Sequence, residues 1–159
     1  MLGGGYVEGQ NYDEFYYNWR KELDNPSLAT ASVTNTYSVK DLKDKVDAFY
    51  SQNGSQKINL VGHSLGGILA RTYAQRYGTE KINKIVTVGS PHQGVVKAYN
   101  AWEGAEVIDT RRITFYDIFL QAVTFWRQKH FGHVSNLEAV RKAVPSAKNL
   151  LPTFDFLID

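Results

Sequence analysis

Length, composition and charge exclude several classes of protein before any motif is considered. The chain has 159 residues, a net charge of +2, 43% hydrophobic and 21% charged residues, and no cysteine, which suits one globular domain with a real core. The small charge argues against nucleic acid as a partner, and the lack of cysteine excludes disulfide and thiol chemistry.

The first part of the chain predicts a strand, a loop and a helix. Residues 12–17 are rich in Tyr and Phe, which favours a strand, and the polar residues 21–37 indicate a connecting loop. Ser38 is placed to cap a helix that runs to about Ser51. The apolar face expected for this helix consists of Val39, Leu42, Val46, Phe49 and Tyr50.

Strands and helices then alternate around a sharp turn. Residues 57–61 favour a buried strand, residues 67–77 favour a helix closed by Gly78, and residues 82–88 favour a further strand. This order predicts the α/β class, with a parallel sheet covered by helices.

From about Val95 to Val144 the pattern becomes helical. Residues 113–131 favour one helix and residues 136–144 favour a second. The apolar face expected for the first consists of Tyr116, Phe119, Leu120, Val123 and Trp126. A stripe of this kind is found most often on helices that pack on a core.

Residues 62–66 read G-x-S-x-G, and their context matters more than the match itself. A strand before the serine and a helix after it are typical of a nucleophile elbow, where the hydroxyl of Ser64 projects from a strained turn. We expect both glycines of the motif to avoid collisions, and Gly67 to allow a close helix–sheet approach. The pattern indicates a serine hydrolase or acyltransferase. The alternative is a Gly-rich turn with a passive serine.

Four segments together resemble the α/β-hydrolase-fold lipases, and within them lecithin:cholesterol acyltransferase-like proteins and related bacterial lipases. Residues 61–67 resemble the elbow of these lipases, and residues 9–20 resemble their Y-D-W-R segment. Residues 88–94 resemble their G-[ST]-P-H-x-G strand end, and residues 145–152 resemble the P-S-x-x-x-L-L-P segment that follows their lid region. Asn18 departs from the family, which usually has Asp there, and so puts a structural ion pair in doubt.

The resemblance implies a partial α/β-hydrolase fold with a helical cap or lid insertion. Residues 1–159 would form a single, incomplete domain, with the sheet core at 1–94 and the cap at 95–150. The aromatic face of the cap would shelter an acyl chain from water, although the same side chains could simply pack on the body of the protein. The chain would be a segment of a longer protein, whose remaining sheet strands come from the rest of the parent chain.

The expected reaction is acyl transfer through Ser64. A histidine takes the serine proton, the alkoxide attacks a carboxylic ester of a lipid, and an acyl-enzyme forms. The backbone N–H of Leu65 would stabilise the oxyanion at the positive end of the following helix. No cofactor or metal is expected, because the sequence has no metal-ligand spacing and no phosphate-binding motif.

Histidines near the elbow are expected to contact the substrate pocket rather than to act as the base. His63 precedes the nucleophile, and we expect its side chain to point away from the Ser64 hydroxyl. His92, followed by Gln93, comes at the end of the next strand, where both would wall the pocket or touch the substrate.

The base and its acidic partner remain open in the sequence. A triad of Ser64, Asp109 and either His130 or His133 has the chain order that this fold requires. The resemblance instead places both partners beyond Asp159. On that interpretation the chain by itself would be poorly active or inactive.

Three functions remain compatible with the sequence. The first is a serine esterase or lipase, the second is a lipid O-acyltransferase of the same family, and the third is a catalytically dead module that binds a lipid or a protein. No apolar stretch reaches the about 18 residues of a membrane-spanning helix, so any membrane contact would be at the lipid interface. Residues 1–5 show no signal peptide, and the compartment stays undetermined, with secretion of the full-length protein still open.

Overall fold

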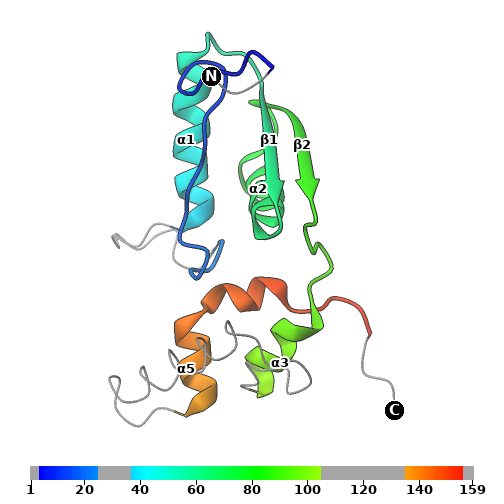
Figure 1. The fold of residues 1–159 in the computed structure, drawn as a ribbon. Coiled ribbons are helices and arrows are strands. Elements are labelled where there is room, and N and C mark those ends of the chain that lie inside the picture. Colours follow the sequence, from blue (N-terminus) through cyan, green and yellow to red (C-terminus); the bar gives the residue numbers. More distant parts are fainter. Residues whose placement is uncertain (1–3, 25–36, 105–134, 156–159) are drawn as a thin grey trace. The chain divides into compact units, whose positions relative to one another are not determined.

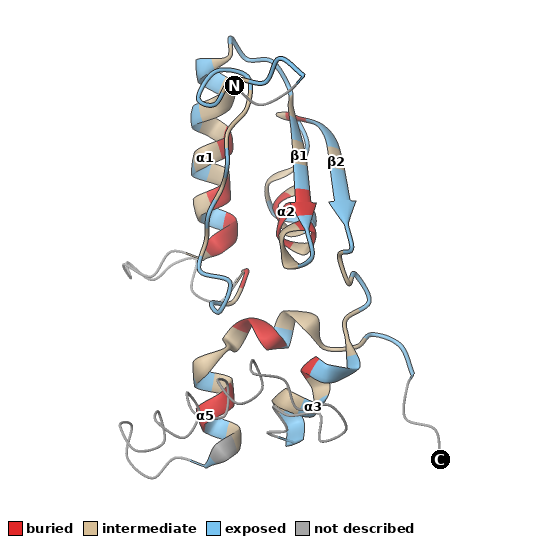
Figure 2. Ribbon diagram, in the orientation of Figure 1, coloured by how far each residue is buried: buried red, intermediate tan, exposed pale blue. Residues whose placement is uncertain are grey.

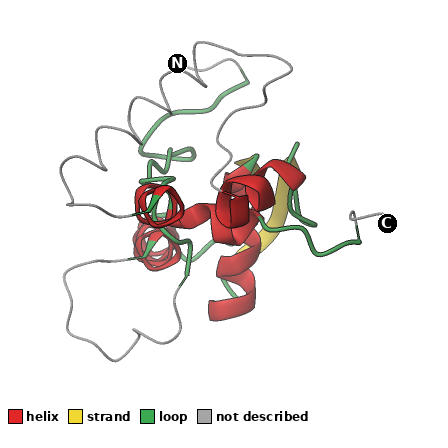
Figure 3. Cartoon of the chain, turned by 90° about the horizontal axis from the view of Figure 1, so that it is seen from below, coloured by secondary structure: helices red, strands yellow, loops and turns green. Residues whose placement is uncertain are grey.

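The computed structural model describes residues 4–24, 37–104 and 135–155. The chain divides into two compact units, each described by itself below. The first comprises Met1–Trp19 and Leu23–Ser90, and the second comprises Arg20–Glu22 and Pro91–Asp159. Among the described residues, strands occur only in the first unit, and the second is built from helices and loops. Figure 3 colours the helices, strands and loops of the chain.

The first unit contains a parallel pair of strands connected by a helix. In chain order its elements are α1 (Ser38–Gln52), β1 (Ile58–His63), α2 (Leu65–Tyr77) and β2 (Ile82–Val88) (Figure 1). β1 and β2 pair in parallel from Ile58↔Ile82 to His63↔Val88. The predicted α/β class is confirmed, and so are the predicted helix–strand–helix–strand order and the closure of α2 at Gly78.

A single apolar layer holds these elements together. α2 packs on both strands, and α1 packs on α2. Of the face of α1 predicted from the sequence, Val39, Leu42 and Val46 are buried, because they recur every three or four positions, whereas Phe49 and Tyr50 are half-buried. The buried core of the unit consists of Leu23, Val39, Leu42, Val46, Leu69, Tyr73 and Ile82.

The strand predicted at residues 12–17 is wrong. Tyr12 forms only an isolated bridge with Glu8, and the residues after it have no regular structure. The segment is nevertheless held, because Phe15 and Tyr17 stack with 5.9 Å between ring centroids and pack against the core. A strand is defined by its ladder, and no described strand pairs with this segment.

The N-cap predicted at Ser38 is also wrong. Tyr37 is the N-cap, without a side-chain hydrogen bond, and Ser38 is the first helical residue at 2% exposure. The start of α1 is satisfied by backbone instead, since the Val39 N–H donates to the Leu23 carbonyl at 3.0 Å. A buried helix start that finds a backbone acceptor does not need a side-chain cap.

The two strands are buried on one face only, which corrects the expectation of a buried, helix-covered strand at 57–61. Val61, Val86 and Val88 are 72%, 46% and 51% exposed, and Figure 2 shows the exposed residues along both strands. Parallel sheets are normally covered on both faces. In the described part of the unit, α2 covers one face and no helix covers the other.

The second unit packs three short helices around one another. These are α3 (Val96–Gly104), α5 (Asn136–Ala143) and the 3-10 helix η2 (Pro145–Leu150). α5 confirms the helix predicted at 136–144, whereas the helix predicted at 113–131 lies outside the described residues. No helix in the described ranges has the length and apolarity needed to cross a membrane.

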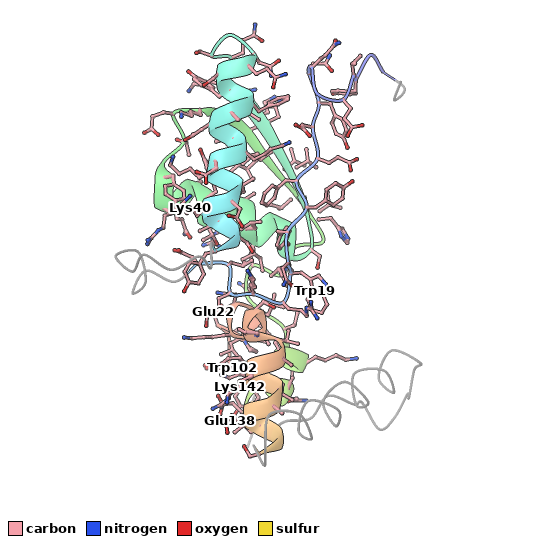
Figure 4. All side chains as sticks on the ribbon, turned by 90° about the vertical axis from the view of Figure 1, so that its left-hand side faces the viewer. Trp19, Glu22, Lys40, Trp102, Glu138 and Lys142 are labelled. Atoms are coloured by element: carbon pink, nitrogen blue, oxygen red, sulfur yellow. The ribbon has the colours of Figure 1, made fainter. Side chains whose placement is uncertain are left out.

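Polar contacts fix α5 within the second unit. The Ser135 hydroxyl accepts from the Glu138 N–H at 3.2 Å, and Glu138 pairs with Lys142 one turn later at 2.6 Å (Figure 4). The Arg141 guanidinium lies over the Trp102 ring of α3, 5.2 Å from its centroid. It also donates to the Trp102 carbonyl at 2.9 Å, so α5 is anchored to α3.

Asp47 provides a stability test for the first unit. Its carboxylate accepts from Lys43 and Lys81, both at 2.6 Å, and these hydrogen bonds lower its pKa below the ordinary value of 3.8. We expect Asp47→Asn to reduce the free energy of unfolding by about 0.5–1 kcal/mol at pH 7. A carboxylate whose pKa is lowered by folding stabilises the folded state at pH values above its pKa in the unfolded chain. The difference in the free energy of unfolding should therefore vanish as the pH falls through the pKa of Asp47 in the folded state.

Asp44→Asn is the matched control, because Asp44 pairs only with Lys40 of its own helix in the contacts the structure shows. Denaturant titrations at pH 7 and at acid pH check the expectation. An Asp47 effect that persists unchanged in acid would contradict the assigned cause.

Candidate functional site

Ser64 occupies a strained turn between β1 and α2. Its backbone has φ 52° and ψ −123°, a conformation that residues with a side chain rarely adopt. Two hydrogen bonds hold it there: the Ser64 N–H donates to the Val88 carbonyl at 2.9 Å, and the Ser64 carbonyl accepts from the Gly67 N–H at 3.1 Å. The residue is exposed.

Glycine is required at two of the three positions around this turn. A Cβ at Gly62 would collide with the backbone of Gly66 and Gly67, and a Cβ at Gly67 would collide with Ser90 and Thr87. The expectation for Gly66 is wrong, because a Cβ there would meet only the Tyr17 hydroxyl at 3.9 Å. The end of β1 therefore lies close to the first turn of α2, and that turn also lies close to the end of β2.

Leu65, the predicted oxyanion donor, lies directly after Ser64 at the start of α2. It is the first residue of α2, where the N–H has no partner within the helix. No backbone acceptor for this N–H is found among the described residues. Its half-buried side chain packs against the core of the first unit.

His63 is exposed at the end of β1, immediately before the turn. Its Nε2 lies near Gly89, 3.9 Å from where a Cβ on that glycine would be. The structure therefore brings together His63, Ser64 and Leu65 on one elbow, with His63 directed toward the segment after β2.

His92 and Gln93 belong to the second unit, so the structure does not place them relative to Ser64. Both are exposed in a turn that the Gly94 N–H closes on the Pro91 carbonyl at 2.9 Å. The Gln93 carbonyl accepts from the N–H and the hydroxyl of Thr153 at 2.9 and 3.3 Å. The backbone of this turn is thus held by a segment about 60 residues further along the chain.

The remaining candidates for a base and an acid are not placed. Asp109, His130, His133 and Asp159 lie outside the described residues, and Asp155 is exposed in the second unit. In the described ranges no group of three or more His, Asp or Glu side chains could hold a metal ion.

Sequence reasoning missed three residues that shape these sites. Burial raises the pKa of Tyr17, whose hydroxyl lies beside Gly66. The Ser90 hydroxyl is buried against Gly67 without a hydrogen-bond partner among the described residues. Thr153 holds Gln93. Of the three, only Ser90 could have been found from the sequence, because it lies in the strand-end segment at residues 88–94. The contacts of Tyr17 and Thr153 depend on tertiary structure.

Comparisons with known proteins find a matching family and several relatives. The profile of a family described as palmitoyl protein thioesterase matches residues 21–139. Phospholipase A(1) LCAT3 of Arabidopsis thaliana is 23% identical over 103 residues, which cover 63% of this chain and 21% of that protein. The GPI inositol-deacylase of Eremothecium gossypii is 31% identical over 110 residues, which cover 58% of this chain and 10% of that protein.

An uncharacterized protein of Saccharomyces cerevisiae is 33% identical over 84 residues, which cover 52% of this chain and 11% of that protein. The chain therefore spans between 10% and 21% of the length of these three relatives.

Gly66 and Gly67 form a matched pair for testing the close approach. We expect Gly67→Ala to lower the free energy of unfolding by about 1–3 kcal/mol, because the new methyl group overlaps Ser90. Gly66→Ala should raise it by about 0.5–1 kcal/mol, since alanine favours the helix and its methyl group would only be in ordinary contact with the Tyr17 hydroxyl. Equal effects of the two substitutions in a denaturant titration would contradict the packing described.

Proposed function

The chain belongs to the palmitoyl protein thioesterase family, a lipase-like α/β-hydrolase family, and from this premise we propose that it carries the nucleophile of a serine hydrolase. The proposed substrate is a fatty-acyl ester or thioester, and Ser64 forms the acyl-enzyme. The names of the relatives, a phospholipase A(1) and a GPI inositol-deacylase, support a lipid substrate.

The conformation of Ser64 is the observation that carries this proposal. An exposed serine at φ 52° and ψ −123°, held by Val88 on one side and by Gly67 on the other, stores backbone strain that a passive turn does not need. Strain of this kind gathers where a side chain must be presented in one orientation. Here it presents the hydroxyl beside the first turn of α2.

The proposed reaction proceeds by two acyl transfers. A histidine base takes the Ser64 proton as Oγ bonds to the acyl carbonyl carbon. The carbonyl then re-forms, its bond to the leaving oxygen or sulfur breaks, and the leaving group takes that proton. Water repeats the sequence, releases the fatty acid and restores the serine. The Leu65 N–H faces the developing oxyanion, and the dipole of α2 adds to its effect.

We assign the base and its acidic partner to polypeptide outside residues 1–159. Support comes from the chain order of this fold, in which an acid and then a histidine follow the serine on later strands. His63 and His92, with Gln93, are assigned to the wall of the pocket and to substrate contact. His63 suits a wall because its ring lies near Gly89.

Residues 95–150 are proposed to form a cap over the acyl-binding site, with the sheet core at 1–94. The ends of the capping span meet: the Val95 N–H donates to the Leu150 carbonyl at 2.8 Å, and Thr153 donates to Gln93. An insertion whose ends are joined can be carried on the body of an enzyme without disturbing it.

A covalent serine probe tests the assignment of Ser64. In the product of the complete reading frame that contains these residues, we expect a fluorophosphonate to label one serine. Ser64→Ala should slow labelling by about 1,000-fold or more, because no other nucleophile is activated.

Ser55→Ala is the matched control, since Ser55 is also exposed and also has positive φ, 62°. The Ser55→Ala variant should be labelled at the same rate as the unchanged protein. Labelling that survives Ser64→Ala, or a complete protein that is not labelled at all, would exclude Ser64 as an activated nucleophile and favour a catalytically dead binding module.

A further inference from the structure

The turn that follows α1 contains a sequence pattern that the proposed catalysis does not use. Residues 53–55 read Asn-Gly-Ser, which matches N-x-[ST], the acceptor pattern for N-linked glycosylation. One other asparagine of the chain, Asn25, is followed by serine at this spacing, but Pro26 stands between the two residues and excludes it. Asn53 is therefore the one asparagine among the 159 residues that meets the pattern.

A match of three residues is common by chance, so the local structure has to decide whether it is an acceptor. An acceptor must lie in a surface loop, and here Gly54 and Ser55 are both exposed. A Cβ on Gly54 would meet no atom of the described residues within 4 Å. The turn therefore has room beside it for a bulky hydrophilic group.

The pattern lies on a tight turn rather than inside a helix or strand. Gly54 and Ser55 have φ of 63° and 62°, and the Ser55 N–H donates to the Tyr50 carbonyl at 2.9 Å. Proline in the middle of the pattern could not adopt this conformation, because its ring fixes φ near −65°. Glycine adopts it freely, so the fold favours a residue that the acceptor pattern allows.

The Asn53 side chain is half-buried, yet its position is compatible with a glycan. Its amide nitrogen, Nδ2, carries two hydrogens and donates to the Phe49 carbonyl at 2.9 Å. Glycosylation replaces one of these hydrogens and keeps the other, so the hydrogen bond at the end of α1 can be retained. The modification does not require the helix end to unwind.

The turn is far from the elbow within the same unit. In Figure 1 it lies at the start of β1, whereas the elbow follows the arrowhead at the other end of that strand. β1 has six residues, and at about 3.3 Å per residue it separates the two by roughly 20 Å. A glycan on Asn53 would therefore be attached well away from Ser64.

We propose that Asn53 is an N-glycosylation site of the complete protein. Nδ2 bonds to the anomeric carbon of an oligosaccharide that is carried on a lipid pyrophosphate. The bond from that carbon to the pyrophosphate breaks, the pyrophosphate leaves with the electron pair, and the amide gives up one proton to the transferase. The three relatives come from eukaryotes, whose secretory pathway contains such a transferase. The first unit then faces the lumen of that pathway.

Removal of the glycan tests the proposal. The product of the complete reading frame is expressed in eukaryotic cells and digested with peptide N-glycosidase F. Compared with the unchanged protein, Asn53→Gln and Ser55→Ala should each lack one glycan, seen as one step in electrophoretic mobility before digestion. Ser55→Thr should keep it, because threonine also fits the pattern. Ser51→Ala is the matched control, since Ser51 is exposed two residues before the acceptor, and it should keep the glycan.

Digestion in heavy-oxygen water identifies the modified residue by mass spectrometry. The glycosidase converts a glycosylated asparagine to aspartate with oxygen from the water, so we expect a labelled aspartate at position 53. An unlabelled aspartate there would show spontaneous deamidation of the Asn-Gly pair and overturns the proposal, as does an unmodified Asn53. Ser64→Ala should leave the glycan in place, so a failure of the proposed catalysis does not alter this result.

Pro26→Ala shows why an unmodified Asn53 would fail, because this substitution completes the pattern at Asn25. A glycan on Asn25 alone would mean that the transferase reaches the protein and rejects the turn. A glycan on neither residue would mean that this part of the protein does not enter the lumen. Both results overturn the proposal, the first through the local geometry and the second through the compartment.

Discussion

The hydrogen bond between the Ser64 N–H and the Val88 carbonyl is the contact on which the elbow depends. It continues the parallel β1–β2 ladder by one residue beyond its regular end, into a backbone conformation that residues with a side chain avoid. The turn can be this tight only because Gly62 and Gly67 let strand and helix approach each other. Packing of α2 on both strands therefore supplies the free energy that keeps Ser64 in its orientation.

The rest of the first unit is arranged around that approach. α1 is fixed to α2 by a continuous apolar core and to the start of β2 by Asp47 and Lys81. One face of the strands and one edge of β1 lack such partners in the described part of the chain. The elbow is thus built on half of a layered structure, and its strain needs a rigid scaffold.

Sequence patterns predicted what is local and missed what depends on distant contacts. The β1–α2–β2 order and the two ends of β2 follow from periodicity and glycine positions, and all agree with the structure. The strand at 12–17 failed because a ladder needs a neighbour, and the cap at Ser38 failed because Leu23 supplied an acceptor from another segment. Gly66 was expected to be sterically required, yet only Gly67 lies against β2. The motif located Ser64, but no local pattern could identify its base.

The most direct test of the central claim is to trap the acyl group. The product of the complete reading frame is mixed with an activated palmitoyl ester, quenched in acid and digested, and the acylated peptide is identified by mass spectrometry. We predict a palmitoyl group on Ser64 that forms and decays with turnover. Turnover with the acyl group on another residue would contradict it.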